Sequence, residues 1–223
     1  MKKILISTIL VAIGCFSMTA QSTVLNNPDN KPYFGIRVGA DVSCPGNITA
    51  GSVGLSVFNN GGGFEFGGIY NIPVVANFYI EPGLKLFYDT YSLKEEWVKF
   101  IQGGIILDSG SIRKFGMRIP VVAGYHFDFT DDVKVSVFTG PELEVGFSGK
   151  EYLKGRNIES SGSVYGDNGS MNRANILWTL GAGIAYQHFY FDIKGGIGMA
   201  NMLSDSDATL HENHVTFTLG YNF

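Results

Sequence analysis

Hydrophobic and polar residues alternate along the chain from residue 33 onward. The alternation is clearest over 214–223, where Val, Phe, Leu, Tyr and Phe occupy the odd positions and small or polar residues occupy the even ones. A two-residue repeat is typical of a β-strand with one apolar face, because successive side chains point to opposite sides. The sequence therefore predicts an all-β fold.

The same alternation marks eight segments in all. We expect strands at 33–43, 62–71, 78–89, 115–126, 133–147, 176–186, 189–198 and 214–223. Pro82, Pro120 and Pro141 fall inside three of them. Because proline has no backbone N–H to donate to a neighbouring strand, we expect bulges or local breaks at these positions.

The connections between these strands alternate in length. Residues 72–76, 128–132 and 187–188 form short turns, and the long connections are 44–61, 93–110, 150–171 and 201–212. Short turns at one end and long loops at the other are typical of outer-membrane barrels, whose long loops face outside. The predicted fold is an eight-stranded antiparallel transmembrane β-barrel with short periplasmic turns and long extracellular loops, located in the cell outer membrane.

Alternation alone does not say which face lines the interior, so a soluble lipocalin-like barrel is the structural alternative. Bulky aromatic and aliphatic residues fill the apolar face, whereas an eight-stranded interior is barely wide enough for packed side chains. Glycines fall mostly on the polar face, and aromatic residues mark both ends of the apolar face, as in Phe78 with Tyr88 and Phe115 with Tyr125. A membrane strand needs ~9–11 residues between its aromatic girdles. These observations favour apolar side chains facing lipid.

Composition agrees with a membrane barrel. The 223 residues are 45% hydrophobic and 16% charged, with 30 Gly, 17 Phe and 11 Tyr. A soluble protein carries about 25% charged residues. The net charge is −4 and no run of Lys and Arg occurs, so nucleic acid is not an expected partner.

The first twenty residues have the pattern of a signal peptide. Lys2 and Lys3 precede a short apolar run, and small residues near Ala20 suit cleavage. We therefore predict a signal peptide over 1–20, an N-terminal periplasmic segment over 21–32 and the barrel over 33–223. The residues before Cys15 loosely match a lipidation motif, so a lipoprotein is the alternative.

Charged residues are concentrated on the predicted inward face. The predicted lumen charge network comprises Arg37, Asp41, Glu65, Glu81, Lys85, Asp89, Arg118, Lys134, Glu142, Glu144, Asp192 and Lys194, with His126 and His214 nearby. Buried charges need partners of opposite sign, so we interpret the set as a salt-bridged plug. A conductive or proton-handling path is the alternative.

The long loops offer the other candidate sites. The loop after the third strand carries Trp97, Phe100, Ile101, Ile105 and Ile106, which form a candidate contact surface for a partner. Packing against another loop or the membrane interface is the alternative for these residues. His211 and His214 could serve a hydrolase, but residues three apart on an extended chain point to opposite faces. We predict no catalytic, cofactor or metal-binding residue.

Three short motifs carry a family resemblance. Residues 81–84 (EPGL), 118–122 (RIPVV) and 139–143 (TGPEL) resemble signatures of the PorT-like outer-membrane barrels of Bacteroidetes, with Arg118 in place of the family's usual Glu. Residues 35–41 (GIRVGAD) are similar to the family's first strand. The resemblance implies an eight-stranded barrel. Phe223, with Phe217 and Tyr221 on the same face, is similar to the C-terminal signal that the outer-membrane assembly machinery reads.

Taken together, these features predict a non-enzymatic outer-membrane barrel that acts through its extracellular loops, in surface interaction or envelope structure. The expected partners are outer-membrane lipid, the assembly machinery during insertion and a surface or envelope protein. A narrow passive pore with a charged lumen is the alternative function.

Overall fold

The computed structural model describes residues 31–96, 98, 107–130, 132–155, 159–166, 169–204 and 207–223. The predicted signal peptide, and all of the following segment except its last two residues, lie outside the described residues. No helix in the described part of the chain is long and apolar enough to cross a membrane.

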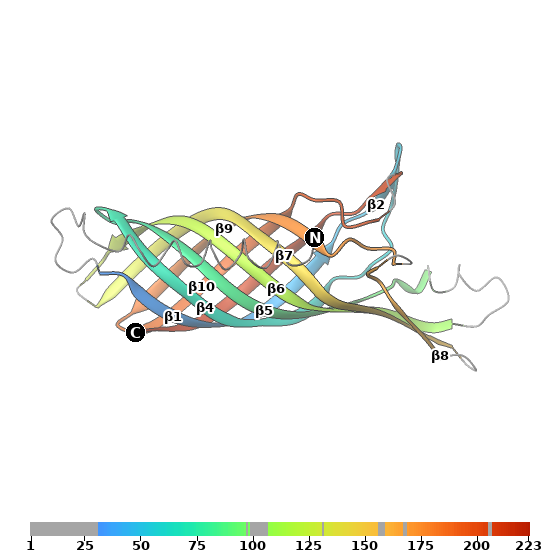
Figure 1. Cartoon of the computed structure of the whole chain (residues 1–223), viewed down its shortest axis with the longest axis horizontal. Coiled ribbons are helices and arrows are strands. Elements are labelled where there is room, and N and C mark those ends of the chain that lie inside the picture. The colour runs from blue at the N-terminus through green and yellow to red at the C-terminus, as the bar shows by residue number, and fades with distance from the viewer. Residues whose placement is uncertain are drawn as a thin grey trace, which may run out of the picture.

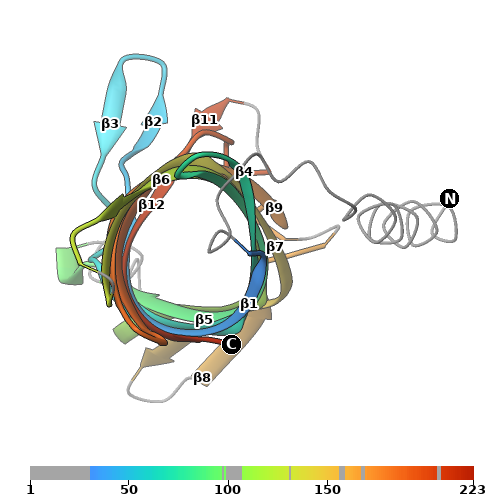
Figure 2. The same cartoon turned by 90° about the vertical axis from the view of Figure 1, so that its left-hand side faces the viewer.

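Eight antiparallel strands form a closed ring, as predicted (Figures 1 and 2). They are β1 (Tyr33–Pro45), β4 (Gly61–Val75), β5 (Phe78–Ser92), β6 (Leu107–Asp128), β7 (Val133–Gly155), β9 (Ala174–Tyr186), β10 (Phe189–Gly198) and β12 (Glu212–Asn222). Each pairs with the next in this order, and β12 pairs with β1 to close the ring. Closure leaves no unpaired strand edge facing lipid.

Tight turns join the strands at one end of the barrel. Ala76 and Asn77 connect β4 to β5, and Gln187 and His188 connect β9 to β10. The first residue of each turn has positive φ, 47° at Ala76 and 54° at Gln187, as two-residue hairpins that follow the strand twist require. The prediction of a turn over 72–76 is wrong by a few residues, because β4 continues through Pro73 with a register shift before Val75.

The three prolines inside the strands cause breaks and no register shift. The β5–β6 ladder skips from Pro82 to Lys85, and the β6–β7 ladder skips from Pro120 to Ala123, with unchanged register on both sides. The register shift in the membrane part of the β6–β7 ladder lies instead opposite Phe115 and Gly116, where Phe147 is the extra residue in β7. Loss of single hydrogen bonds is therefore tolerated without shifting the strands.

Apolar side chains cover the outside of the barrel, which confirms the predicted orientation. Leu180, Ile197 and Leu219 are each 66% exposed on this face. Aromatic rings form a band at each end, Phe64 with Tyr88 near the loops and Phe78 with Tyr125 near the turns. Ten residues separate the bands along β5, about 25 Å along the barrel axis for a rise of ~3.3 Å per residue and a tilt of ~40°. This height matches the ~25 Å apolar band of outer-membrane barrels.

Glycines on the inner face make room for large side chains. A Cβ atom at Gly124 would lie 2.3 Å from the Tyr79 ring, and one at Gly181 would lie 2.3 Å from the Phe138 ring. Real Cβ atoms essentially never come this close to another atom, so a side chain at either position would have to displace the ring. The predicted link between inward glycines and a crowded lumen is confirmed.

At the loop end, β6 and β7 extend past the other strands of the barrel (Figure 1). β6 has 22 residues and β7 has 23, about twice the number needed to cross. The predicted long loops contain further short strands: β8 (Glu159–Ser163) pairs with the end of β7, and β11 (Ala208–Thr209), β2 (Ile48–Ala50) and β3 (Val53–Leu55) form a small sheet. The described residues at this end are therefore built largely of paired strands.

The close approach at Gly181 gives a prediction for folding. We expect Gly181→Ala to destabilise the barrel by ~1–3 kcal/mol, because the new methyl group overlaps the Phe138 ring. Gly195→Ala on the adjacent strand is the matched control, since a Cβ there meets nothing within 4 Å. Urea unfolding followed by unheated gel mobility measures both variants. Equal midpoints for the two would contradict this account of the lumen.

Candidate functional site

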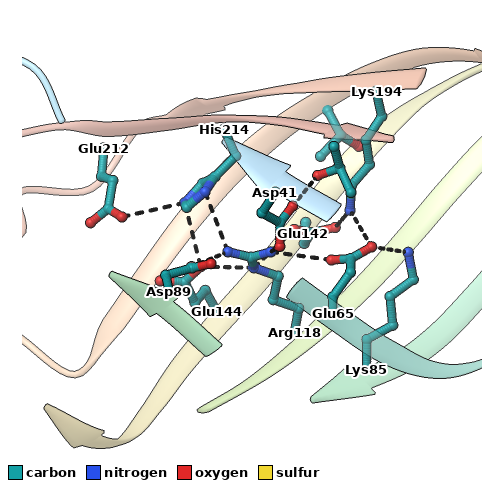
Figure 3. Close-up of polar contacts among 12 residues, drawn as sticks. Asp41, Glu65, Lys85, Asp89, Arg118, Glu142, Glu144, Lys194, Glu212 and His214 are labelled. Atoms are coloured by element: carbon teal, nitrogen blue, oxygen red, sulfur yellow. Dashed lines mark hydrogen bonds and ion pairs between the residues drawn. The ribbon is translucent and has the colours of Figure 1, made fainter. Parts of the chain in front are cut away.

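A buried arginine lies at the centre of the lumen. The Arg118 guanidinium, from β6, donates to Asp41 at 2.7 Å, Glu65 at 3.1 Å, Asp89 at 2.6 Å and Glu144 at 2.9 Å (Figure 3). These carboxylates come from β1, β4, β5 and β7. Arg118 is fully buried. A planar guanidinium with five donors suits several carboxylates at once, which a lysine could not hold in the same geometry.

Three lysines extend this network in both directions along the lumen. Toward the loops, Lys114 Nζ lies 2.7 Å from Glu212 and 3.4 Å from Glu144. Toward the turns, Lys194 Nζ lies 2.6 Å from Glu142 and 3.6 Å from Glu65. Lys85 Nζ also lies 2.6 Å from Glu65. Shared carboxylates therefore connect all four cations into one network.

His214 sits against the Arg118 guanidinium and is nearly fully buried. Its Nδ1 lies 3.3 Å from an Arg118 nitrogen and accepts the hydrogen bond, which assigns the ring proton to Nε2. Asp89, Glu144 and His214 bring ligand atoms within 4.8 Å of one another, a spacing that could hold a metal ion. Arg118 contacts all three groups, so its positive charge already occupies the place that a cation would take.

The buried charges of both signs favour a salt-bridged lumen over a lumen that conducts ions. Seven carboxylates and five basic side chains are buried among the described residues. The cavity beside the network, between Arg37, Lys85 and Lys194, has a volume of about 20 Å³, enough for about one water molecule. Unpaired charges in such a space would be costly, and groups of opposite charge lie within ion-pair distance through the centre of the lumen.

A cluster of buried apolar residues, here called the cap, lies at the loop end of the lumen. Tyr91 and Ile112, from the ends of β5 and β6, pack against residues from two long loops. The loop residues of this cap are Val164, Tyr165, Met171, Met202 and Leu210. Burial raises the pKa of Tyr165 to about 12, so its phenol stays neutral near neutral pH and adds no charge to the cap.

Two asparagines hold the loops of the cap together. Asn172 donates through its side chain to the carbonyls of Asn201 and Leu203, at 3.0 and 2.8 Å. The Asn201 side chain donates to Ala208 O at 2.8 Å and accepts from Leu210 N at 2.9 Å. These bonds fix loop backbone that would otherwise be held only by packing, so the cap is a built structure.

The turn end of the lumen is filled by rings and opens into a shallow mouth. Tyr79 packs with Val122 and Phe138, and the His126 ring stacks on Tyr79 with centroids 4.2 Å apart. The Arg37 guanidinium lies 4.2 Å from the centre of the Tyr190 ring. Below these rings, a pocket of about 190 Å³ faces the periplasm. Ion pairs, an apolar cluster and stacked rings therefore lie at three levels of the lumen among the described residues.

Ten of the twelve residues of the predicted lumen network are buried in the lumen. Glu81 is half-buried and accepts a hydrogen bond from Asn71 at 3.0 Å. Lys134 does not join the network. Its side chain is 46% exposed at the periplasmic mouth, 3.8 Å from Asp128, because alternation assigns a residue to a face and not to a depth.

Sequence reasoning missed Lys114 as a member of the network and placed Glu212 in a loop. Both lie on the inward face just beyond the strand ends predicted at 115 and 214. Continuing the alternation outward from Arg118 and His214 would have found them. His211 and His214, which were considered for a hydrolase, differ in burial: the His211 side chain is exposed and the His214 side chain is buried.

Two further predictions concerned the C-terminal aromatic residues and the candidate loop contact surface. Phe217, Tyr221 and Phe223 are exposed on the lipid-facing side at 44%, 39% and 64%, and the Phe223 ring stacks with Phe34 at 6.0 Å. The five residues of the candidate loop contact surface, from Trp97 to Ile106, lie outside the described residues.

Comparison with known proteins agrees with this architecture. The model of the outer membrane protein beta-barrel domain family matches residues 16–204. No curated protein matches the chain.

Three similar solved structures have identities of 16% or less and TM-scores below 0.5, so the likeness bears on no function. They include the outer membrane protein OprG from Pseudomonas aeruginosa (12% identity, 87% of this chain and 97% of that chain, TM-score 0.48). The attachment invasion locus protein Ail of Yersinia pestis has 16% identity over 86% of this chain and 99% of that chain, TM-score 0.39. Neisserial surface protein A has 10% identity over 85% and 97%, TM-score 0.42.

The central guanidinium gives a stability prediction. We expect Arg118→Met to destabilise the barrel by ~3–5 kcal/mol, because it leaves several buried carboxylates without their cation. Lys134→Met is the control, with an expected change of ~0–1 kcal/mol for an exposed ion pair. Urea midpoints in lipid vesicles measure both. A loss for Arg118→Met no greater than that of the control would show that the network does not stabilise the barrel.

Proposed function

The chain belongs to the outer membrane protein β-barrel domain family, and we propose that it is a non-enzymatic barrel that presents its extracellular strands and loops to a surface or envelope partner. The observation that carries the proposal is the closed lumen. Ion pairs fill its centre, apolar side chains cap its outer end and rings fill its inner end. A barrel closed at three levels leaves the extracellular end as the surface available for recognition.

The small sheet outside the membrane supplies a suitable surface. The β2–β3 hairpin projects from the barrel wall (Figure 2), and β3 lies at the edge of its sheet. Val53 and Leu55 on this strand are 56% and 41% exposed. An edge strand with exposed apolar side chains can pair with an extended segment of another protein. The candidate loop surface around Trp97 belongs to the same proposal.

The alternatives receive less support. A passive pore needs a continuous water path, which the central ion pairs and the apolar cap oppose. An enzyme needs a nucleophile, a base and an orienting group around a site open to substrate. In the part of the chain that the structure describes, the acids and histidine that cluster are buried against Arg118.

Assembly and export complete the proposal. Phe217, Tyr221 and Phe223 form an outward-facing aromatic row suited to recognition by the outer-membrane assembly machinery. Residues 1–20 would direct export, and a closer relationship to the PorT-like barrels of Bacteroidetes rests on the three motifs of the sequence.

A closed lumen predicts that the barrel does not conduct ions. The refolded chain, verified by a heat-shifted gel band, should give no discrete channel steps in a planar lipid bilayer, because buried ion pairs and apolar residues block the water path. Bilayer conductance tests this directly. Reproducible steps of one size from the verified barrel would support the pore and refute the plug.

The proposed partner surface predicts position-specific crosslinking in cells. A photoreactive amino acid at Val53 or Leu55 should yield discrete protein adducts, because both side chains are exposed outside the membrane. Trp97 tests the loop surface in the same way. Phe191, which is 43% exposed on the lipid-facing side, is the matched control and should yield only lipid adducts. Absence of protein adducts from all three extracellular positions would refute the proposal.

A further inference from the structure

Two basic residues lie side by side on the outer face of the barrel wall. Arg113 of β6 and Lys150 of β7 are directly opposite each other in the antiparallel register, and both are exposed. The neighbours of Arg113, Ile112 and Lys114, are buried toward the interior. Because side chains alternate along a strand and opposite residues share a face, Arg113 and Lys150 both point away from the barrel.

The depth of this pair corresponds to the lipid headgroups. Arg113 lies two residues beyond Phe115, whose ring meets Phe147 at 5.9 Å in the outer aromatic band. Two residues of a tilted strand rise ~5 Å along the barrel axis. Aromatic girdles sit at the interface between hydrocarbon and headgroups. The two cations are therefore placed just above the hydrocarbon, on the extracellular side.

The pair is not neutralised by the protein. Like charges directly opposite each other destabilise a sheet. Among the residues that the structure describes, neither Arg113 nor Lys150 forms an ion pair with a carboxylate. Farther from the membrane on the same strand, Lys154 does have an acidic partner, Glu159, at 3.6 Å. The uncompensated charge is thus confined to the headgroup level on this wall.

Neighbouring groups complete a row of donors. The Arg113 guanidinium lies 4.6 Å from the centre of the Tyr152 ring, which restrains it. Thr90 of β5 lies opposite Arg113, and Ser163 of β8 lies opposite Lys150. The Thr90 hydroxyl, the Arg113 guanidinium and the Lys150 ammonium therefore follow one another across three adjacent strands, directly above an apolar surface, whereas the Ser163 hydroxyl donates to the Tyr165 carbonyl at 2.8 Å.

We propose that this row binds the phosphate groups of a phosphorylated glycolipid in the outer leaflet, of the lipid A class. Arginine binds phosphate with two parallel hydrogen bonds, and lysine adds a mobile charge. The acyl chains of the same lipid lie against Phe115 and Phe147, which are 42% and 47% exposed below the cations. The continuity of the cations with this apolar surface points to a lipid and not to a soluble phosphate.

The test uses the refolded full chain in phosphatidylcholine vesicles containing either phosphorylated or dephosphorylated lipid A. Wild-type protein should retain phosphorylated lipid A, detected by native mass spectrometry after extraction. We expect R113Q/K150Q to weaken retention ~10–30-fold, for about 1 kcal/mol per basic residue near an anionic surface. K31Q/K134Q removes two exposed lysines at the periplasmic mouth and should have no effect. R113K/K150R keeps both charges and should retain most of the binding.

Several results would overturn the proposal. These are unchanged retention in a folded R113Q/K150Q barrel, equal retention of dephosphorylated lipid A, or displacement of the lipid by inorganic phosphate at matched concentration, which would indicate a soluble ligand. If the double variant does not give a heat-shifted band, the wild-type barrel still tests the proposal. Its retention of phosphorylated lipid A should fall as salt is raised, and salt-independent retention would refute a charged site.

Discussion

The whole interior depends on one guanidinium surrounded by carboxylates from four strands. Arg118 ties β6 to β1, β4, β5 and β7 through bonds of 2.6 to 3.1 Å. A soluble domain holds its strands together by burying apolar side chains, but this barrel turns its apolar side chains to lipid. Its core must therefore be built from polar groups, which are stable out of water only when every charge has partners. The inward glycines follow from the same constraint, because the network and its flanking rings need the space.

A polar core of this kind fills the inside of the barrel, so the surfaces available to other molecules are the lipid-facing wall and the two ends. The ion pairs occupy the centre and the apolar cap lies at the loop end, an arrangement that supports the proposed closed lumen. The strands continue above the membrane at this end. Their edges and exposed apolar residues, such as Val53 and Leu55, are the features through which a closed barrel can still interact with its surroundings.

Sequence reasoning predicted what depends on local alternation. It placed eight strands, the outward apolar face and ten inward charges, because each of these follows from a repeat of two residues. Depth and strand length were not predicted in the same way. Lys134 has the expected face but lies at the mouth, and Lys114 was missed because the predicted strand began only at Phe115, after Arg113 and Lys114. Their place in strands depends on pairing with β7, which is a contact between distant parts of the chain.

The adjacent residues Arg113 and Lys114 show how strictly this pairing is specified. One faces the headgroup level outside, while the other is fully buried inside against Glu212. A one-residue slip of β6 would exchange their faces and would also turn Arg118 toward lipid and Phe115 toward the lumen. Each exchange would place a charge in hydrocarbon or an aromatic ring among carboxylates. The ion-pair network therefore sets the register of β6, and in doing so it fixes which cations remain outside to meet the membrane surface.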